Sequence, residues 1–361
     1  MIIFSFPSMP ISTPHDIISI MRIKFLNSKI ANQFFFISTL ADWHYSVRKE
    51  DREAWISMTG QLSSHEEDVL KRFRDLLQTK YGFQSPETYL GEIFYKQNAK
   101  EAWKKLEKIT GSKKAIFIKD AFRTFEMKFE AAQEKIDRIG LNALAKELKK
   151  REVVSFLNEV ATLFGNDAAQ NETVTIIPLF SPKNGNYTAA GSANLIGNYI
   201  TIELPALHAD TWQMSYSLAL VGHEIGHLFF KKRGGKDMIA ETMKKMRLKK
   251  KYQPLPFETL SLLNEAVTAS LVPMGALGQK YFSNTLAKIF FSDLPRGTAA
   301  AISVRKNQRT SYYSNLEMYF VWKLFPMAAR YLNEKKAIDE VFVKEAASIL
   351  KDLVKKNSGG R

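Results

Sequence analysis

The chain has 361 residues, of which 45% are hydrophobic, so it can bury a substantial core and is not a disordered tail. It contains no cysteine, which excludes disulfides, thiolate metal ligands and a cysteine nucleophile. The formal net charge of +15 favours anionic partners, but no nucleic-acid recognition motif accompanies it, so no specific nucleic-acid binding is expected.

The N-terminal residues resemble neither a membrane span nor a secretion signal. No stretch of the chain reaches the roughly 18 uninterrupted apolar residues that a span needs, and "MIIFSFPSMPISTP" lacks a basic start and is broken by prolines. The segment that starts at Met21, "MRIKFLNSKIANQFFFISTLA", has a basic front, but its asparagines and glutamine weaken it as a signal. We expect a helix there, and a soluble protein for which the cytoplasm is favoured.

Helical periodicity dominates residues 28–165. It runs through "SKIANQFFFISTLADWHYS", "SSHEEDVLKRFRDLLQTKYG", "AKEAWKKLEKIT" and a long segment from about 113 to 164. Ser63 and Glu66 are spaced to form a capping box at the start of the second of these helices. We therefore expect residues 1–165 to form a helical N-terminal region, and residues 166–361 to form a core with a helical C-terminal part.

A change of pattern occurs at residues 172–205. "TVTIIPLF" and "NYITIELP" are rich in β-branched residues and are flanked by the turn-forming segments "SPKNGN" and "AAGSANLIGN". After residue 210 the period is helical again to the C-terminus, and the basic cluster "KKMRLKKK" at 244–251 is expected to be a solvated face or loop. The expected fold class is α+β, mostly helical, with a small sheet before a long helix at 211–232.

That long helix carries the motif "LALVGHEIGHLFF", residues 218–230. His223 and His227 are four residues apart, so a helix stacks their imidazoles on one face at chelate spacing. Glu224 follows His223 and can reach a water held between the rings without being a ligand itself. The competing interpretation, two core histidines bonded to backbone, leaves the buried charge of Glu224 unexplained.

The motif predicts catalytic zinc chemistry. Neutral histidines bind Zn²⁺ at about 2.0–2.1 Å, and one carboxylate would complete three protein ligands and leave a fourth position for water. Glu224 would accept a proton from that water as it attacks a peptide carbonyl, and would then deliver a proton to the leaving amine. A structural zinc site would need another protein ligand, and no adjacent histidine or cysteine offers one.

The order of elements resembles that of the zincins, and among them the gluzincin peptidases, whose third zinc ligand is a glutamate on the helix after the HExxH helix. The resemblance covers residues 199–270, about a fifth of the chain. It implies that the strand before the motif binds extended substrate, here through Ile200, Thr201 and Ile202, although an ordinary sheet strand explains these residues equally well. It also implies a tyrosine that stabilises the oxyanion, for which "RTSYYSNLEMYF" offers Tyr312 and Tyr313, and Tyr319 further on.

Three glutamates follow the motif as possible third ligands. Glu241 lies in a highly charged stretch, where solvation by water and nearby lysines explains it, and Glu258 lies in a first helical turn, where the helix dipole explains it. Glu265 is mid-helix among apolar residues in "LSLLNEAVTASLV", and "NEA" resembles the gluzincin ligand segment. We therefore expect Glu265 to bind the metal; a buried pair with an arginine such as Arg305 is the alternative.

One position departs from the thermolysin-like gluzincins. Those proteins have an aspartate four residues after the ligand glutamate, which orients a zinc histidine, whereas this chain has Ala269. Thr268, Ser270 or a residue from elsewhere must replace it, or the site is weaker.

The sequence as a whole predicts a zinc-dependent metallopeptidase that acts on a peptide or protein. Two alternatives remain: a zinc hydrolase with a non-peptide substrate, and a basic helical binding protein with a vestigial metal site. Substrate specificity, oligomeric state and the role of residues 1–165 are not predicted.

Overall fold

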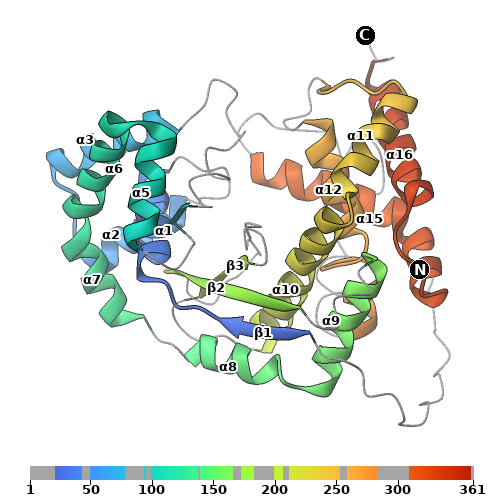
Figure 1. Ribbon diagram of the computed structural model, residues 1–361, viewed down its shortest axis with the longest axis horizontal. Helices are drawn as coiled ribbons and strands as arrows, with labels where there is room; N and C mark the ends of the chain where they lie inside the picture. The colour runs from blue at the N-terminus through green and yellow to red at the C-terminus, as the bar shows by residue number, and fades with distance from the viewer. Residues whose placement is uncertain are drawn as a thin grey trace.

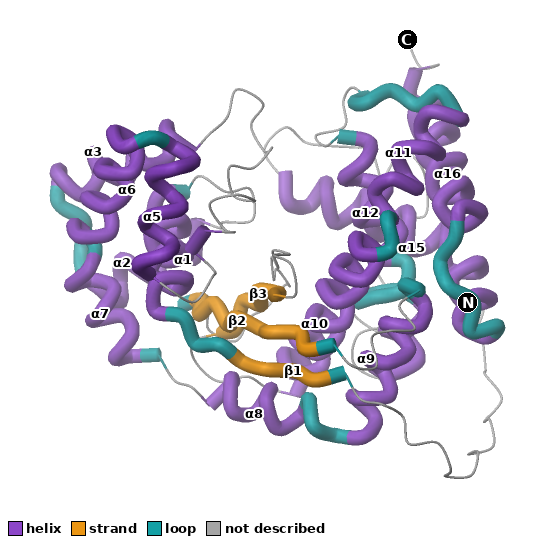
Figure 2. The backbone as a smooth tube through the Cα atoms, viewed as in Figure 1, coloured by secondary structure: helices purple, strands orange, loops and turns teal. Residues whose placement is uncertain are grey.

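A computed structural model describes residues 21–42, 49–77, 93–94, 99–136, 139–165, 172–182, 199–205, 211–252, 258–282 and 309–358. Most of these residues are helical, and one small sheet lies between two groups of helices (Figures 1 and 2). The expected α+β, mostly helical class is confirmed.

The sheet has three parallel strands in the order β1-β2-β3: β1 (Arg22–Phe25), β2 (Thr173–Ser181) and β3 (Tyr199–Pro205). The expectation of a helix from Met21 was wrong for its first residues. "RIKF" alternates exposed and half-buried side chains, which suits an edge strand, and it pairs with the start of β2. The helix begins only after Ser28, whose hydroxyl accepts a hydrogen bond from the Ala31 N–H.

The first group of helices covers one face of the sheet. It consists of α1 (Lys29–Ala41), α2 (Lys49–Thr59), α3 (Ser64–Leu77), α5 (Ala99–Thr110), α6 (Ser112–Thr124) and α7 (Glu126–Lys135). Its core joins apolar residues of these helices to Ile177 and Leu179 of β2. The Ser63–Glu66 capping box is confirmed: the Ser63 N–H donates to Glu66 Oε2, and the Glu66 N–H donates to Ser63 Oγ.

The second group of helices covers the opposite face. It consists of α8 (Ile139–Glu147), α9 (Arg151–Leu163), α10 (Thr211–Lys232), α11 (Gly235–Lys245), α12 (Thr259–Ala269), α15 (Arg309–Asn333) and α16 (Glu340–Ser358). Ile176, Ile200 and Ile202 of the sheet are fully buried in its core. Because α8 and α9 also join this core, packing groups them with α10; the domain boundary at residue 165 stays a prediction.

Two glycines of the motif let α9 lie close against α10. A Cβ atom at Gly222 would lie 2.3 Å from Phe156 Cζ, and one at Gly226 would lie 2.7 Å from Phe164 Cε2. Gly222 and Gly226 are four residues apart, like the two histidines, so they form one face of α10. Phe156 of α9 and Phe164, the C-cap of that helix, occupy that face, which leaves the neighbouring histidine face for α12.

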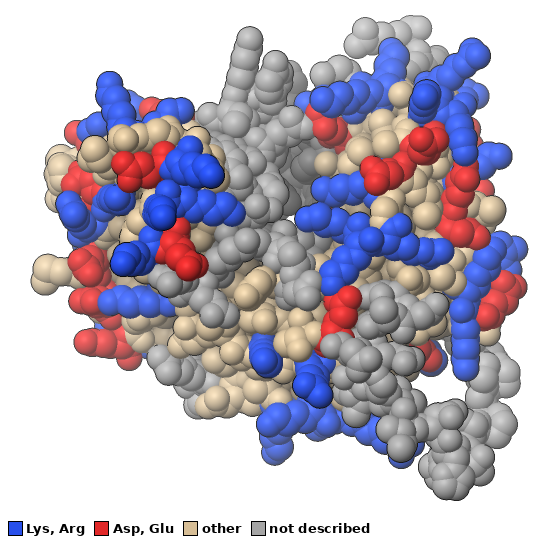
Figure 3. Space-filling view, viewed as in Figure 1, with Lys and Arg blue, Asp and Glu red and all other residues tan. Residues whose placement is uncertain are grey.

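Basic side chains are spread over both groups of helices, with acidic side chains between them (Figure 3). The lysines and arginine of 244–251 are exposed, as expected for a solvated segment. In the part of the chain that the structure describes, no helix has both the length and the apolar character needed to cross a membrane.

Candidate metal centre

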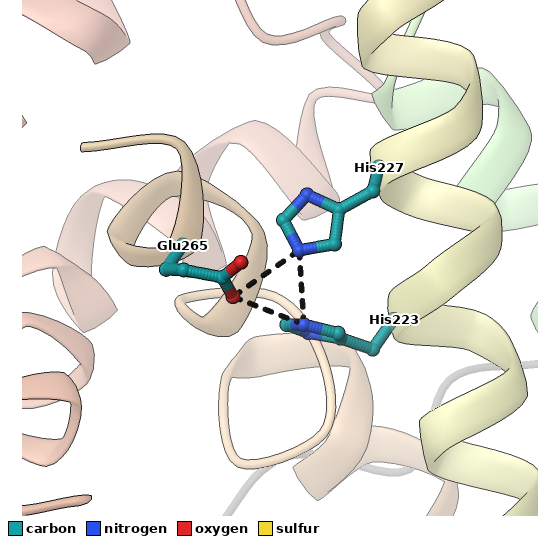
Figure 4. A group of neighbouring side chains, drawn as sticks. All are labelled: His223, His227 and Glu265. Carbon is teal, nitrogen blue, oxygen red and sulfur yellow. Dashed lines mark hydrogen bonds and ion pairs between the residues drawn. The ribbon is translucent and has the colours of Figure 1, made fainter. Parts of the chain in front are cut away.

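Helices α10 and α12 bring three possible metal ligands together. Figure 4 shows the rings of His223 and His227 projecting from α10 towards the carboxylate of Glu265 on α12. The Nε2 atoms of the two histidines are 3.0 Å apart. Glu265 Oε2 lies 3.3 Å from His223 Nε2 and 3.2 Å from His227 Nε2. These two histidines and this glutamate form a group that can hold a metal ion.

The backbone fixes the orientation of His223. Its Nδ1 atom lies 2.7 Å from the carbonyl oxygen of Val272. A carbonyl can only accept a hydrogen bond, so Nδ1 carries the proton and donates it. In the neutral imidazole, the lone pair is therefore on Nε2, the atom that faces Glu265 and His227.

Thr268 supports His227 in the same way. Its hydroxyl donates to the backbone carbonyl of Asn264 at 3.0 Å, and its oxygen lies 3.2 Å from His227 Nδ1. With its proton already donated, this oxygen accepts the Nδ1–H of His227. The Asn264 side-chain nitrogen Nδ2 lies 2.9 Å from the same Nδ1. An amide nitrogen donates, so the Nδ1–H assigned here requires the Asn264 amide to be turned by 180°, with its oxygen towards the ring as a second acceptor. The Nε2 lone pair of His227 then faces the centre.

Of the proposed replacements for the missing aspartate, Thr268 is thus the one that contacts a histidine. Ser270 hydrogen-bonds the Val267 carbonyl instead. The Val272 carbonyl is a support that the sequence did not reveal, because a backbone oxygen from the turn after α12 leaves no signal in side-chain pattern.

The pKa values of the three ligands favour a positive species among them, either a proton or a metal ion. Burial lowers the pKa of His223, but the hydrogen bond to Glu265 and nearby carboxylate charges outweigh burial and raise it to about 10. Burial raises the pKa of Glu265, but both histidines outweigh this effect and hold it well below its ordinary value. Burial lowers the pKa of His227. Without a metal ion, a proton on His223 Nε2 therefore lies among the three ligand atoms, and a metal ion must displace it.

Glu224 lies beside the ligands without joining them. It is 4% exposed, and its Oε1 is 3.8 Å from His223 Nε2. Burial raises its pKa to about 8, although the charge of His223 acts in the opposite direction. A cation bound by the neighbouring ligands would lower this pKa and stabilise the carboxylate, so Glu224 is suited to exchange protons near neutral pH.

The centre is most accessible at Glu265. The side chains of His223 and His227 are 8% and 5% exposed, whereas 31% of the Glu265 side chain is exposed. Of the three ligands, Glu265 is therefore the one whose side chain meets solvent.

The other glutamates after the motif lie away from the ligand group. Glu258 is the residue before α12 and pairs with Lys250 at 3.2 Å, and Glu241 is exposed on α11. Arg305, the alternative partner of Glu265, lies outside the described residues.

The remaining predicted site residues stay untested. Ile200, Thr201 and Ile202 are in β3 with fully buried side chains. Tyr312 and Tyr313 fall in the first turns of α15, but their side chains lie outside the described part of the structure. Tyr319, further along α15, is buried in the core around α10.

One acidic residue near the centre was missed. Glu317 lies on α15, and its pKa is raised to about 7 by burial, with the charges of His223 and Glu265 also acting on it. In "NLEMYFVW" it is a lone acid in an apolar helical segment, the same signal that pointed to Glu265, so the sequence could have identified it.

In comparisons with known proteins, no family model, no curated protein and no solved structure matches this chain.

Proposed function

We propose that the protein is a zinc-dependent metallopeptidase of the gluzincin type, with His223, His227 and Glu265 as ligands and Glu224 as general base. The observation that supports it best is the meeting of all three ligand atoms within 3.3 Å of one another, beside a second acid, the buried Glu224. A merely structural ion pair would account for Glu265 and one histidine, but not for the second histidine and Glu224.

The spacing of the donors supports a tetrahedral ion such as zinc. In a tetrahedron with bonds of about 2.0–2.1 Å, neighbouring ligands are about 3.3–3.4 Å apart. The three ligand atoms are 3.0, 3.2 and 3.3 Å apart, close to the spacing of three such corners. Two imidazoles and one carboxylate are a usual donor set for catalytic zinc, which keeps the fourth corner open.

Zinc in this position would polarise a substrate carbonyl and acidify water. The residues of the chain would then move the protons. A carboxylate oxygen of Glu224 accepts a proton from the attacking water and delivers it to the nitrogen of the leaving amine. Val272 and Thr268 hold the two imidazoles in the tautomer that binds metal, so the histidines take no part in proton transfer.

Strand β3 supports the proposed binding of extended substrate. It pairs with β2 at the end of the strand order β1-β2-β3. The side chains of Ile200, Thr201 and Ile202 are buried, and a substrate would therefore pair with the backbone of β3. The side chains that set specificity would come from elsewhere.

The test is metal analysis of the purified chain followed by a cleavage assay on a mixed peptide library. We expect about one zinc per chain, peptide cleavage that a chelator abolishes, and recovery when zinc is restored. A folded chain that takes up no zinc would contradict both the peptidase and any other zinc hydrolase. Zinc binding without cleavage of any peptide would favour a non-peptide substrate.

A further inference from the structure

Residues 270–278, which follow α12, form a tight turn. The N–H of Ala276 donates to the carbonyl of Ser270 at 3.0 Å, and the N–H of Leu277 donates to a second carbonyl at the same distance, that of Leu271. All four of these residues are buried. Hydrogen bonds and burial therefore fix the path of the backbone through the turn.

Two glycines allow the turn to be this tight. A Cβ atom at Gly275 would lie 1.8 Å from the carbonyl oxygen of Ser270. One at Gly278 would lie 1.7 Å from the carbonyl oxygen of Pro273. The crowding atoms belong to the backbone and not to flexible side chains, so any other residue at either position must move the turn itself.

The turn carries Val272 directly against α10. Its side chain approaches that helix at Gly222, where an added Cβ would lie 3.3 Å from Val272 Cγ1. Its carbonyl accepts the Nδ1–H of the next residue of the helix, His223, at 2.7 Å. A displacement of the turn by about 1 Å would take this carbonyl oxygen out of hydrogen-bonding distance.

The end of the turn is anchored to α9. The ring centroid of Tyr281 lies 5.3 Å from that of Phe156, the residue that also occupies the glycine face of α10. Lys280 Nζ lies 2.6 and 2.8 Å from the carboxylate oxygens of Glu159. The turn is thus held by α9, α10 and α12 together.

We propose that Gly275 and Gly278 are positioning residues for His223. By allowing the tight turn, they place the carbonyl of Val272 where it accepts the Nδ1–H of that ligand. This inference rests on the ligand group of the proposed function and adds a division between its two histidines. The turn after α12 orients His223, whereas side chains of α12 itself orient His227.

The test is nitrogen–proton NMR of protein with isotope-labelled histidine, in the metal-free and the zinc-loaded forms. In the unaltered metal-free chain, the Nδ1–H of His223 should exchange with water at least about tenfold more slowly than a side-chain N–H of His65, which is exposed on α3. Exchange as fast as that of His65 would overturn the proposal. Since this measurement needs neither zinc nor cleavage, its outcome is separate from a failure of the proposed function.

Gly275→Ala should release His223 alone. We expect its Nδ1–H to exchange at least about tenfold faster, and exchange at His227 to change by less than about twofold. Zinc affinity should fall about 10- to 100-fold, as for the loss of a support to a metal ligand. The matched control is Gly165→Ala, whose added Cβ would lie 2.2 Å from the side chain of Arg233, just after α10. It should leave exchange at both histidines and the zinc affinity unchanged.

A folded Gly275→Ala protein with unchanged exchange at His223, or with the same increase at both histidines, would overturn the assignment. If this variant does not fold, Lys280→Gln takes its place. Loss of the partly exposed pair with Glu159 loosens the anchor of the turn and should speed exchange at His223 by about two- to fivefold. Unchanged exchange in Lys280→Gln would then overturn the proposal.

Discussion

Replacing Thr268 by valine tests how the chain positions His227. Valine has nearly the same shape as threonine but cannot accept the Nδ1–H of His227, so a fully buried donor loses one acceptor. Loss of such a support lowers metal affinity by about 10- to 100-fold. Asn264 remains 2.9 Å from the same nitrogen, so we expect the lower end, about tenfold, or about 1.4 kcal/mol.

The matched control is Thr242→Val. Thr242 is also buried in a helix, and its hydroxyl donates to the carbonyl of Met238, four residues earlier, as that of Thr268 does to Asn264. Each variant loses one such bond, worth about 1 kcal/mol of unfolding free energy, but only Thr268→Val changes a ligand. A zinc titration against a competing chelator gives the affinities. Equal zinc affinity in the two variants would refute the assigned role of Thr268.

Three further predictions concern the ligands and their packing. Glu265→Ala should lower zinc affinity by several orders of magnitude, whereas Glu258→Ala should leave it nearly unchanged, as measured by competition with a chelator. If the Glu265 variant kept its zinc affinity and the Glu258 variant lost it, the assignment of the third ligand would be reversed. Zinc affinity should rise about tenfold per pH unit from about 8 towards 10, because the raised pKa of His223 keeps a proton there that zinc must displace, and more steeply below 8, where Glu224 also loses a proton. Calorimetry in buffers of different ionisation enthalpy should show about one proton released above pH 8 and more than one below it, and an affinity independent of pH would contradict this reasoning. Gly222→Ala should lower the free energy of unfolding by about 1–2 kcal/mol, because the clash of the new Cβ with Phe156 outweighs the gain of about 1 kcal/mol in helix propensity. An unchanged or raised melting temperature would show that α9 does not lie so close to α10.

The ligand group was predictable because its residues conflict with their surroundings. His223 and His227 share a helix face by spacing alone, and Glu265 stood out as an acid in an apolar segment. The structure brings these three residues together. The same reasoning applied to "NLEMYFVW" would have found Glu317.

The parts that sequence reasoning missed depend on contacts between distant segments. β1 has only four residues, and its pairing with β2, about 150 residues later, is not encoded in local periodicity. The support from the Val272 carbonyl depends on the path of the backbone after α12. The close approach of α9 also explains the glycines of "GHEIGH", which were not interpreted from the sequence.

The most direct test of the account is the rate of peptide cleavage by Glu224→Gln protein relative to the unaltered chain, with zinc content measured in both. The amide keeps the shape of the side chain but cannot accept a proton, so we expect about one zinc per chain in each protein and a loss of cleavage of several orders of magnitude in the variant. Cleavage by the zinc-loaded variant at close to the unaltered rate would contradict the role of Glu224 and, with it, the proposed mechanism.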